Sequence, residues 1–444
     1  MGMQTSIASA AGLDKLALEN GKVVVFVGVG GCGMRGLATF FLQAGWQVYG
    51  CDAKPLAADD KLLQLGLEVC DVGSVPRASW VVRSAAVPVS DMVFEECIAE
   101  SARPCLYAEF LGEISKIREV VAVAGTHGKT TCTAWIAYGL RQAGVEVGYL
   151  VGAEVPQLGS SSEWGDPSLP LVIESCEYAR SFHHLRPSKV ALINVAAEHP
   201  DTYPGGLPEV TESFAKFLSN TVEGGAIIAG PEAPSQLEKH TSATWMPACS
   251  LPNTISIGLF GKHNRSNAVL VAAVLDDFGL NDEQILHALS TFTGAARRLE
   301  VVKELSLGDG EGITLVSDYA HHPTEVAATI DAARERWPQA KINVVFQPHQ
   351  AQRFQDYRDL YVDCLNEADM VALLPIFRAR DVESCSADSR DLLPDLDVQH
   401  PQRLHNFCEK IEESINWTLS NSTNGSVVLC LGAGDIDGHI RKLH

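Results

Sequence analysis

The sequence predicts an α/β protein of more than one domain, built from mostly parallel sheets. Short apolar segments that suit buried strands alternate with helix-compatible segments along most of the chain, which is typical of parallel sheets covered by helices. At three places such a strand runs directly into a glycine-rich turn and a helix, around residues 28–33, 125–128 and 432–434. With 444 residues, the chain has room for about two to four domains.

The composition is that of a globular protein, and its charge excludes some classes of binding partner. Hydrophobic residues make up 46% of the chain, charged residues 20%, and the formal net charge is −21. This negative charge argues against nucleic acid and anionic membranes as partners. The 12 cysteines have no paired metal-binding spacing, which indicates reduced thiols. Neither a signal peptide nor an apolar run of membrane-spanning length is apparent, so we expect a cytoplasmic protein without membrane insertion.

The first glycine turn has the order of elements that binds a nucleotide diphosphate. A strand at 22–27 leads into Gly-Val-Gly-Gly-Cys-Gly, a helix follows over 34–44, and a second strand at 46–51 ends at an aspartate. This arrangement places a pyrophosphate on the helix N-terminus without specifying the nucleotide. Asp52 could accept a ribose hydroxyl or close a turn, and Ser84 lies in a loop at a strand's carboxyl end. The candidate ligands are Gly28, Gly30, Gly31, Gly33, Asp52 and Ser84.

Residues 121–131 predict a triphosphate-binding loop. Four small apolar residues form a buried-type strand, and Gly-Thr-His-Gly-Lys-Thr-Thr follows before a helix at 132–142. Glycines let backbone N–H groups surround phosphate oxygens, the lysine can span the β- and γ-phosphates, and the next hydroxyl can ligate Mg²⁺. The usual loop has four residues between its glycines, whereas this one has two. We expect ATP and Mg²⁺ here, bound by Gly125, Thr126, His127, Gly128, Lys129, Thr130 and Thr131.

Acidic residues and a histidine follow two strands of the same predicted sheet. Glu174 and Glu177 come after a strand at 171–173, and His199 comes after a strand at 190–194. Carboxylate oxygens suit Mg²⁺, and a histidine is a less usual addition. Taken singly, Glu174 could cap a turn and His199 could be a satisfied buried imidazole. Their position beside a lysine-bearing loop favours metal and phosphate chemistry.

A helix predicted to begin near residue 261 carries two asparagines three residues apart, Asn264 and Asn267. They share one helical face. Their amides offer both a donor and an acceptor, as an adenine edge requires. The alternative is that Asn264 caps the helix.

Residues 294–300 have the composition of a hinge into a further α/β domain. In that domain, strands alternate with helices and are predicted at 314–317, 341–346, 370–374 and 427–431. The first of these strands is followed by Asp318 and then by His321-His322. Adjacent histidines do not easily bind one ion, so zinc is not expected.

These motifs, in this order, resemble those of the Mur ligases of peptidoglycan synthesis, and they span essentially the whole chain. They are Gly-Val-Gly-Gly-Cys-Gly-Met at 28–34, Gly-Thr-His-Gly-Lys-Thr-Thr at 125–131, Gly-Lys-His-Asn-Arg-Ser-Asn-Ala at 261–268, Asp-Tyr-Ala-His-His-Pro-Thr-Glu at 318–325 and Phe-Gln-Pro-His at 346–349. Within the family, the Thr-His of the phosphate loop and Leu-Gly-Ala-Gly-Asp-Ile at 431–436 point to the branch that adds L-alanine to UDP-N-acetylmuramate.

The resemblance implies three domains and one reaction. A Rossmann-like domain at 1–117 would bind the UDP-sugar, a P-loop ATPase-like parallel-sheet domain at 118–295 would bind ATP, and a Rossmann-like domain at 296–444 would bind the amino acid. The lactyl carboxylate of UDP-N-acetylmuramate would attack the γ-phosphate of MgATP. The amine of L-alanine would then displace phosphate from the acyl phosphate.

The resemblance also implies roles for individual residues. The catalytic residues would be Lys129, His199, Glu174 and Arg298. The Mg²⁺ ligands would be Thr130, Glu174 and His199. The base and ribose of ATP would be bound by Asn264, Asn267 and Asp318. The amino acid would be bound by His349, Arg353 and His321.

Four positions depart from the family pattern. The family usually has arginine where Gln350 stands, and a neutral amide cannot grip a carboxylate as a charged bidentate donor does. That leaves Arg353 as the candidate cation. The other departures, at positions where aspartate is usual, are Cys176, Ser317 and Glu198.

Other functions stay open at this point. One is the recycling ligase of the same family, which attaches a whole peptide to the same UDP-sugar but usually departs from Phe-Gln-Pro-His. Another is an NAD-dependent dehydrogenase, which rests on residues 28–33 and Asp52. A third is a non-catalytic nucleotide-binding module, which only Gln350 and Cys176 favour. For the oligomeric state we expect a monomer or weak homodimer.

Overall fold

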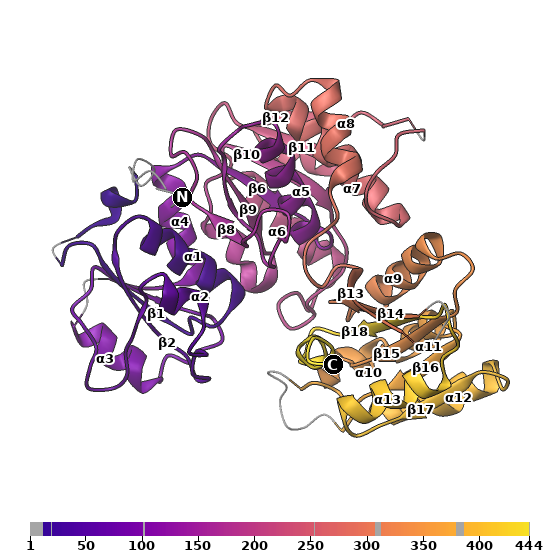
Figure 1. Ribbon diagram of the computed structural model, residues 1–444. Helices are drawn as coiled ribbons and strands as arrows, with labels where there is room; N and C mark the ends of the chain where they lie inside the picture. The colour runs from indigo at the N-terminus through magenta and orange to yellow at the C-terminus, as the bar shows by residue number, and fades with distance from the viewer. Residues whose placement is uncertain are drawn as a thin grey trace, which may run out of the picture. The chain divides into compact units, whose positions relative to one another are not determined.

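The computed structural model is an α/β protein with three sheets, each flanked by helices (Figure 1). It describes residues 12–18, 20–100, 103–252, 254–306, 312–378 and 386–443. The chain forms two compact units. The first contains the chain up to Gly258 together with Ser266–Thr293, and the second contains Leu259–Arg265 and the chain from Gly294 onward.

The first sheet has five parallel strands in the order β3-β2-β1-β4-β5. Because β1 is paired with β2 on one side and β4 on the other, the turn after β1 lies at the topological switch point, where such sheets bind ligands. The strands are β1 Val23–Val27, β2 Gln47–Cys51, β3 Glu68–Val69, β4 Trp80–Arg83 and β5 Arg103–Leu106. The helices are η2 Leu13–Leu16, α1 Cys32–Gln43, α2 Lys61–Gln64, α3 Met92–Glu100 and α4 Tyr107–Ile117.

The second sheet has seven strands in the order β12-β11-β10-β6-β9-β7-β8, and only its β7–β8 pair is antiparallel. Its middle strand, β6, is fully buried, as expected of a strand covered on both faces. The strands are β6 Val120–Ala124, β7 Gly148–Leu150, β8 Ser162–Glu163, β9 Leu171–Ser175, β10 Lys189–Asn194, β11 Ala226–Glu232 and β12 Thr244–Pro247. The helices are α5 Lys129–Gln142, η3 Tyr178–His184, α6 Leu207–Leu218, η4 Ser235–His240, α7 Lys262–Asp277 and α8 Asp282–Thr291.

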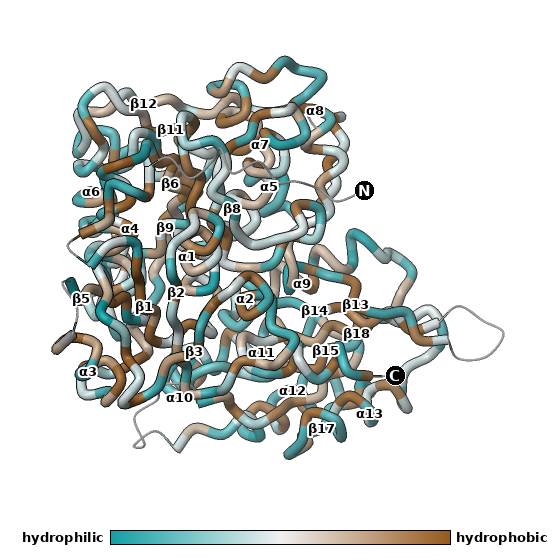
Figure 2. The backbone as a smooth tube through the Cα atoms, turned by 60° about the vertical axis from the view of Figure 1, so that its left-hand side comes forward, coloured by the Kyte–Doolittle hydropathy of each residue, from teal (hydrophilic) through white to brown (hydrophobic). Residues whose placement is uncertain are grey.

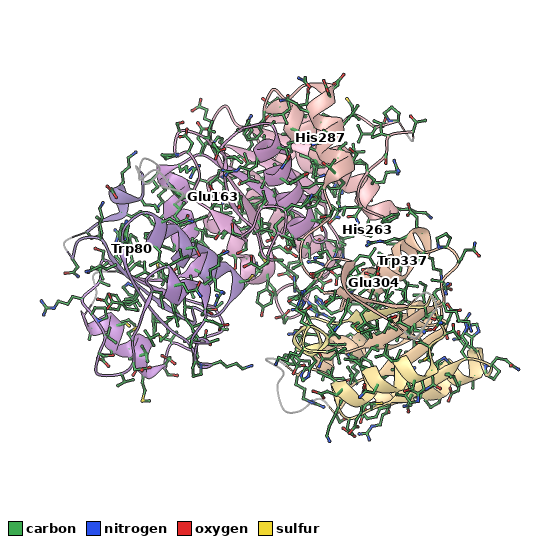
Figure 3. The ribbon with its side chains drawn as sticks, viewed as in Figure 1. Trp80, Glu163, His263, His287, Glu304 and Trp337 are labelled. Atoms are coloured by element: carbon green, nitrogen blue, oxygen red, sulfur yellow. The ribbon has the colours of Figure 1, made fainter. Side chains whose placement is uncertain are left out.

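One continuous apolar core joins the first two sheets into the first unit. Phe40 of α1 meets Trp164 edge to face, with ring centres 5.4 Å apart. Gly36 of α1 lies so close to Leu150 of β7 that a Cβ there would force the leucine side chain to move. The indole N–H of Trp80 on β4, labelled in Figure 3, donates to the carbonyl of Leu16 at 2.8 Å. The two sheets therefore keep a fixed relation within this unit.

The second unit contains a sheet of six strands in the order β13-β14-β18-β15-β16-β17. Only β13 is antiparallel to its neighbour, and apolar clusters cover both faces. In Figure 2 the inner strands are largely brown, the colour of apolar residues. The strands are β13 Glu300–Leu305, β14 Ile313–Asp318, β15 Ile342–Phe346, β16 Met370–Leu373, β17 Leu404–Phe407 and β18 Val427–Leu431. The helices are α9 Pro323–Arg336, α10 Ala351–Asp356, α11 Arg358–Leu365, η5 Ser389–Leu392, α12 Leu393–Gln399, α13 Ile411–Asn421 and α14 Ile436–Ile440.

The predicted α/β class with mostly parallel sheets is confirmed. The boundaries proposed at residues 117 and 295 stay a proposal, because the first two sheets share one compact unit. Across the described part of the chain, none of the helices combines the length and apolar character that crossing a membrane requires.

Candidate functional site

The phosphate loop joins β6 to α5, as the sequence predicts. Gly128 caps α5 with φ of 83°, a left-handed backbone that favours glycine. A Cβ at Gly128 would lie 3.0 Å from Oδ1 of Asn267, so this buried asparagine packs directly on the loop. The helix begins at Lys129, three residues earlier than predicted, because the glycine cap itself starts the first turn.

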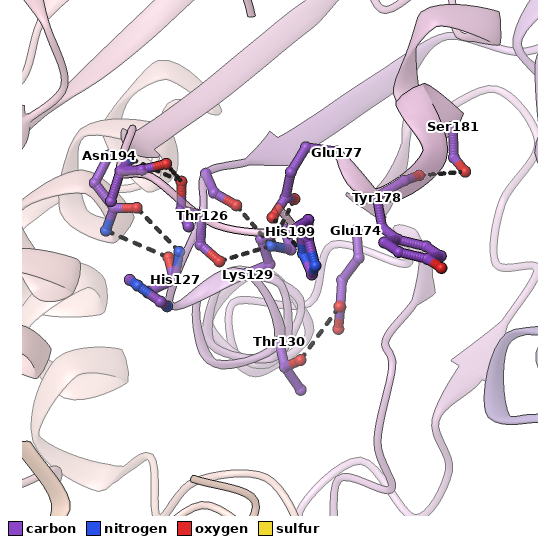
Figure 4. A network of polar contacts seen from close by, with 12 residues as sticks. Thr126, His127, Lys129, Thr130, Glu174, Glu177, Tyr178, Ser181, Asn194 and His199 are labelled. Atoms are coloured by element: carbon purple, nitrogen blue, oxygen red, sulfur yellow. Dashed lines mark hydrogen bonds and ion pairs between the residues drawn. The ribbon is translucent and has the colours of Figure 1, made fainter. Parts of the chain in front are cut away.

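The loop is held in shape by the end of β10 (Figure 4). The side chain of Asn194 accepts a hydrogen bond from the backbone N–H of His127 at 3.0 Å. The hydroxyl of Thr126 accepts one from the N–H of Ala196 at 2.9 Å. These bonds fix the loop before any ligand binds, which lowers the entropy cost of gripping a phosphate.

Lys129 lies inside the loop rather than projecting from it. Its Nζ donates to the carbonyls of Gly125 and Thr126 at 2.7 and 2.9 Å. It also donates to Oε2 of Glu177 at 2.8 Å. Burial alone would lower the pKa of Lys129, but the attraction of Glu177 outweighs burial and the pKa lies above its ordinary value. The lysine is therefore charged, as a phosphate ligand must be.

Glu177 is the acid that pairs with this lysine, and it was absent from the predicted set of site residues. Only 1% of its side chain is exposed, and its Oε1 lies 3.3 Å from Nε2 of His199. Burial opposes its ionisation, yet Lys129 and His199 together bring its pKa down to about 2. The signal in the sequence is a second glutamate just past the end of β9.

His199 adopts a strained backbone next to Glu177. Its φ is 54°, which is uncommon for a residue with a side chain. Its ring meets the ring of Tyr178 edge to face at 5.1 Å. Strain of this kind persists where surrounding structure holds a functional side chain in place.

Glu174 contacts a different part of the site. Its Oε2 accepts a hydrogen bond from the hydroxyl of Thr130 at 3.2 Å, and its Oε1 accepts one from the N–H of Gly152 at 2.5 Å. The predicted metal ligands thus fall into two groups. Thr130 is with Glu174, and His199 is with Glu177 (Figure 4). Oxygen donors in both groups suit a hard cation such as Mg²⁺.

A cavity of about 220 Å³ lies beside the first glycine loop, between the first two sheets of the first unit. Gly33 and Tyr107 line it from the first sheet's side, and Glu174 and Cys176 line it from the second sheet's side. Apolar side chains supply much of the remaining lining, including Leu111, Leu150, Phe182 and Leu185. The cavity can therefore admit part of a ligand that extends from the first glycine loop towards β9.

The first glycine loop has the close contacts that its sequence predicts. Gly28 has φ of 83°, and a Cβ there would lie 2.8 Å from Val87 and 3.0 Å from Ser84. Ser84 thus lies directly beside the loop. Gly31 caps the N-terminus of α1, where backbone N–H groups can meet a phosphate.

Asp52 closes the first loop. Its Oδ2 accepts a hydrogen bond from the N–H of Gly30 at 2.8 Å, and its Oδ1 accepts one from the N–H of Lys54 at 3.1 Å. This is the turn role that the sequence left open, and contact with a ribose stays a prediction. On the other side of the loop, a Cβ at Gly33 would lie 2.6 Å from the hydroxyl oxygen of Tyr107.

In the second unit, Asp318 binds backbone N–H groups of two neighbouring segments. It accepts hydrogen bonds from the N–H groups of Leu299 and Ala320 at 2.7 and 2.8 Å. Burial raises the pKa of Asp318, and the nearby charge of Arg298 partly offsets that effect. The Arg298 guanidinium lies over the ring of Tyr319, 5.4 Å from its centre. The structure therefore brings two predicted site residues of this unit, Asp318 and Arg298, together.

The predicted amino-acid-binding histidines also lie together. The rings of His321 and His349 are 5.5 Å apart, and His349 stacks on Phe377 at 5.7 Å. Arg353 lies on α10 and is 6% exposed. Gln350 precedes that helix with φ of 69°, and its N–H donates to the carbonyl of Phe377 at 3.0 Å.

The remaining predicted residues and departures have local partners. Both asparagines of the predicted adenine site lie on α7, and Nδ2 of Asn264 donates to the carbonyl of Phe260 at 2.8 Å. Contact of either asparagine with a base stays a prediction. Ser317 donates to Oδ1 of Asp437 at 2.7 Å. Glu198 is buried, whereas Cys176 is exposed where it lines the cavity.

Two family models match the chain. The model described as "Mur ligase family, catalytic domain" matches residues 23–118, and the model described as "Mur ligase, glutamate ligase domain" matches residues 297–434. The phosphate loop lies between these two ranges.

Named relatives match nearly the whole chain. The UDP-N-acetylmuramate–L-alanine ligase of Roseiflexus sp. (strain RS-1) is 33% identical over an alignment of 461 residues that covers 92% of this chain and 96% of that protein. The crystal structure of the UDP-N-acetylmuramate–alanine ligase of Thermotoga maritima has a TM-score of 0.75 at 23% identity, covering 94% of this chain and 97% of the other. A murein peptide ligase of Psychrobacter arcticus 273-4 has a TM-score of 0.67 at 22% identity, with the same coverage of both chains. These solved structures share the fold described above.

Proposed function

This chain belongs to the Mur ligase family, and we propose that it joins L-alanine to the lactyl carboxylate of UDP-N-acetylmuramate with hydrolysis of ATP. The observation that carries the proposal is the charged Lys129 held in a pre-formed phosphate loop between Glu177 and the loop carbonyls. A relative that is 33% identical carries this enzyme's name. The phosphate loop supplies what the first half of such a reaction needs.

The reaction has two steps that place different demands on the protein. The carboxylate oxygen of the sugar attacks the γ-phosphorus, ADP leaves, and an acyl phosphate forms. The amine of L-alanine then attacks the acyl carbon, loses a proton, and phosphate leaves. Anionic groups meet in the first step, so the protein must supply cations and N–H donors there.

Lys129 and the loop meet this demand. Donors from the loop backbone and the start of α5 would surround the β- and γ-phosphates. Lys129 is the cation of the loop, and Glu177 and the two loop carbonyls hold its Nζ within it. On triphosphate binding we expect Nζ to exchange a carbonyl for a phosphate oxygen while Glu177 still orients it.

Mg²⁺ belongs to this proposal because the donor set fits it. Two donor groups would hold the ion, Thr130 with Glu174 and Glu177 with His199. Bound Mg²⁺ would supply charge stabilisation to the phosphoryl oxygens. In this proposal Glu177, and not Glu174, shares the ion with His199, because Oε1 of Glu177 lies 3.3 Å from the His199 ring.

The cavity supports the proposed path of the sugar nucleotide. The loop at residues 28–33 would hold the UDP diphosphate, and the lactyl end would reach the phosphate loop of the same compact unit. Its largely apolar lining suits the carbon skeleton and the acetamido methyl group. Glu174 and Cys176 line the end near β9.

For the second step, we assign amino-acid binding to the residues gathered around His321 and His349 in the second unit. Arg353 would pair with the carboxylate of alanine. The absence of a membrane-spanning helix from the described residues is compatible with the cytoplasmic location that such substrates require. A monomer or weak homodimer stays our expectation.

The deciding experiment is phosphate release from ATP with UDP-N-acetylmuramate and a panel of acceptors. The panel comprises L-alanine, L-serine, glycine and a tripeptide that begins with L-alanine. We expect turnover that depends on both the sugar nucleotide and L-alanine. Preference for the tripeptide would instead support the recycling ligase. Calorimetry with UDP-N-acetylmuramate and NAD in parallel tests the first loop, and tighter binding of NAD would contradict the assignment.

A further inference from the structure

Two segments of the first unit carry Glu177 and His199, and a set of contacts ties them together. The segment after β9 has left-handed backbone at Ala179 and Arg180, with φ of 50° and 54°. The segment after β10 has it at His199, with φ of 54°. Three non-glycine residues in this conformation, so close to the site, require neighbours that hold them there.

Tyr203 lies between these segments and is 1% exposed. Its hydroxyl donates to the backbone carbonyl of Glu177 at 2.6 Å. The same hydroxyl lies 3.1 Å from Oγ of Ser213 on α6. Because one hydroxyl has one hydrogen, Tyr203 accepts from Ser213 while it donates to Glu177.

The chain of hydrogen bonds continues to His183. Nε2 of His183 lies 3.0 Å from Oγ of Ser213 and 2.9 Å from its carbonyl oxygen. The Ser213 carbonyl can only accept, so His183 donates through Nε2–H, and this one hydrogen is shared between the carbonyl oxygen and the Oγ of Ser213. Burial lowers the pKa of His183, consistent with a neutral ring. The direction is therefore fixed from His183 through Ser213 and Tyr203 to Glu177, and such chains strengthen each member.

Further contacts fasten the same two segments. The guanidinium of Arg180 lies over the Tyr203 ring at 5.2 Å and pairs with Glu209 at 2.7 Å. The N–H of Ala179 donates to the hydroxyl of Thr202 at 3.3 Å. The Tyr203 ring is thus held on its face as well as at its hydroxyl.

We propose that Tyr203, supported by Ser213 and His183, is a positioning residue that fixes the peptide of Glu177 and so aims its carboxylate at Lys129 and His199. No substrate contact is assigned to Tyr203. It acts on the carbonyl of Glu177, whose side chain is the group we assign to Mg²⁺. The role of Glu177 as a metal ligand rests on the proposed function. The new element is Tyr203 as the residue that orients Glu177.

The test measures Mn²⁺ binding by electron paramagnetic resonance on the full-length protein in the presence of ADP. Mn²⁺ serves as the probe because it is paramagnetic and takes the same oxygen ligands as Mg²⁺. For Tyr203→Phe we expect Mn²⁺ affinity to fall by about 10-fold or more, the usual effect of removing a group that orients a metal ligand. In turnover assays, the KM for Mg²⁺ should rise while the KM for L-alanine stays unchanged.

Tyr138→Phe is the matched control. Tyr138 is also buried, and its hydroxyl lies 3.0 Å from Oγ1 of Thr291 on α8, away from Glu177. Like Tyr203→Phe, Tyr138→Phe removes one phenolic oxygen from the first compact unit. We expect its Mn²⁺ affinity to equal that of the wild type.

The outcomes separate this inference from the proposed function. Wild-type Mn²⁺ affinity in a folded Tyr203→Phe, with weak binding in Glu177→Gln, would overturn the positioning role and leave the proposed function intact. Wild-type affinity in Glu177→Gln would overturn the metal assignment itself. If Tyr203→Phe does not fold, Ser213→Ala breaks the same chain one step earlier. Reduced affinity there supports the proposal, and unchanged affinity overturns it.

Discussion

At the scale of single residues, the site is a balance of charges that are nearly removed from water. Lys129 has 15% of its side chain exposed and Glu177 has 1%, and they are 2.8 Å apart. His199 lies on the other oxygen of Glu177. In such a setting, removing one partner costs more than the pair contributes, because the remaining charge stays buried.

The first prediction concerns Lys129→Ala. Turnover should fall by about 10²-fold or more, since a cation aimed at the transferring phosphoryl group is lost. The free energy of unfolding should fall as well, by about 3–5 kcal/mol, because the buried charge of Glu177 loses its lysine partner. Steady-state kinetics and urea denaturation measure the two effects.

Lys129→Ala combined with Glu177→Gln is the control for that experiment. The double variant removes both charges, so it should recover most of the lost stability while staying inactive. Near-normal turnover in a folded Lys129→Ala protein would contradict the phosphate-loop assignment.

The second prediction concerns pH and Glu177. Its pKa in the folded protein is about 2, below the usual 4.5. A depressed pKa contributes stability that is complete above the unfolded-state value and is lost as the pH falls towards the folded-state value. The difference in free energy of unfolding between wild type and Glu177→Gln should therefore shrink between about pH 5 and pH 2. Denaturation at a series of pH values checks this, and a constant difference would contradict it.

At the scale of elements, glycine conformation and close packing shape the phosphate loop together. Gly128 has a left-handed backbone and also lies against Asn267. Gly144, just after α5, has almost the same φ, 80° against 83°, but a Cβ there would meet nothing within 4 Å. A substitution by alanine at Gly144 therefore tests backbone strain alone, and the same substitution at Gly128 tests strain together with crowding.

The third prediction uses this pair. Gly144→Ala should lose about 1–2 kcal/mol of stability through backbone strain alone and keep its affinity for ADP. Gly128→Ala should lose similar stability and, in addition, weaken ADP binding by about 10-fold, because either the loop or Asn267 must shift. Calorimetric titration with ADP measures the difference. Equal affinities in the two variants would show that crowding at Gly128 is unimportant.

The elements also show what sequence could and could not predict. Most inner strands can be read from the sequence because a strand covered on both faces is continuously apolar, and β18 has the predicted bounds, 427–431. Two inner strands of the second sheet, β7 and β11, were not predicted. The edge strands β8, β12 and β17 were not predicted, since short and partly exposed segments become strands only through the neighbour they pair with. Likewise, the phosphate loop was readable from local spacing. The choice between Glu174 and Glu177 was not, because it depends on which carboxylate the chain after β9 turns towards Lys129.

At the scale of the whole molecule, the predicted chemistry is distributed over three sheets in two compact units. The diphosphate loop follows β1, the triphosphate loop follows β6, and the histidine group follows β14 and β15. Each is at the carboxyl end of a parallel strand, where open α/β sheets bind ligands. Variants in different sheets should therefore change the KM of different substrates. Measuring these KM values tests the assignment of one substrate to each sheet.

The fourth prediction applies this test to the second unit. Arg353→Ala should raise the KM for L-alanine by about 10-fold or more, because a charged hydrogen bond contributes about 1.5–3 kcal/mol. Gln350→Arg should lower that KM several-fold by supplying a second cation. The KM for ATP should change little in both variants, since its phosphates are assigned to the first unit.

Gln350 is a favourable place for this gain-of-function change. Its φ of 69° is strained for any residue with a Cβ. Glutamine already bears that strain, so arginine adds none to the backbone. Arg353 is buried, and its removal can also destabilise the protein, so Arg353→Lys serves as a control that keeps the charge and loses the bidentate fork. We expect its KM for L-alanine to lie between those of wild type and Arg353→Ala, with the thermal midpoint of each variant measured alongside. An unchanged KM in a folded Arg353→Ala protein would refute the assignment of Arg353 to the alanine carboxylate.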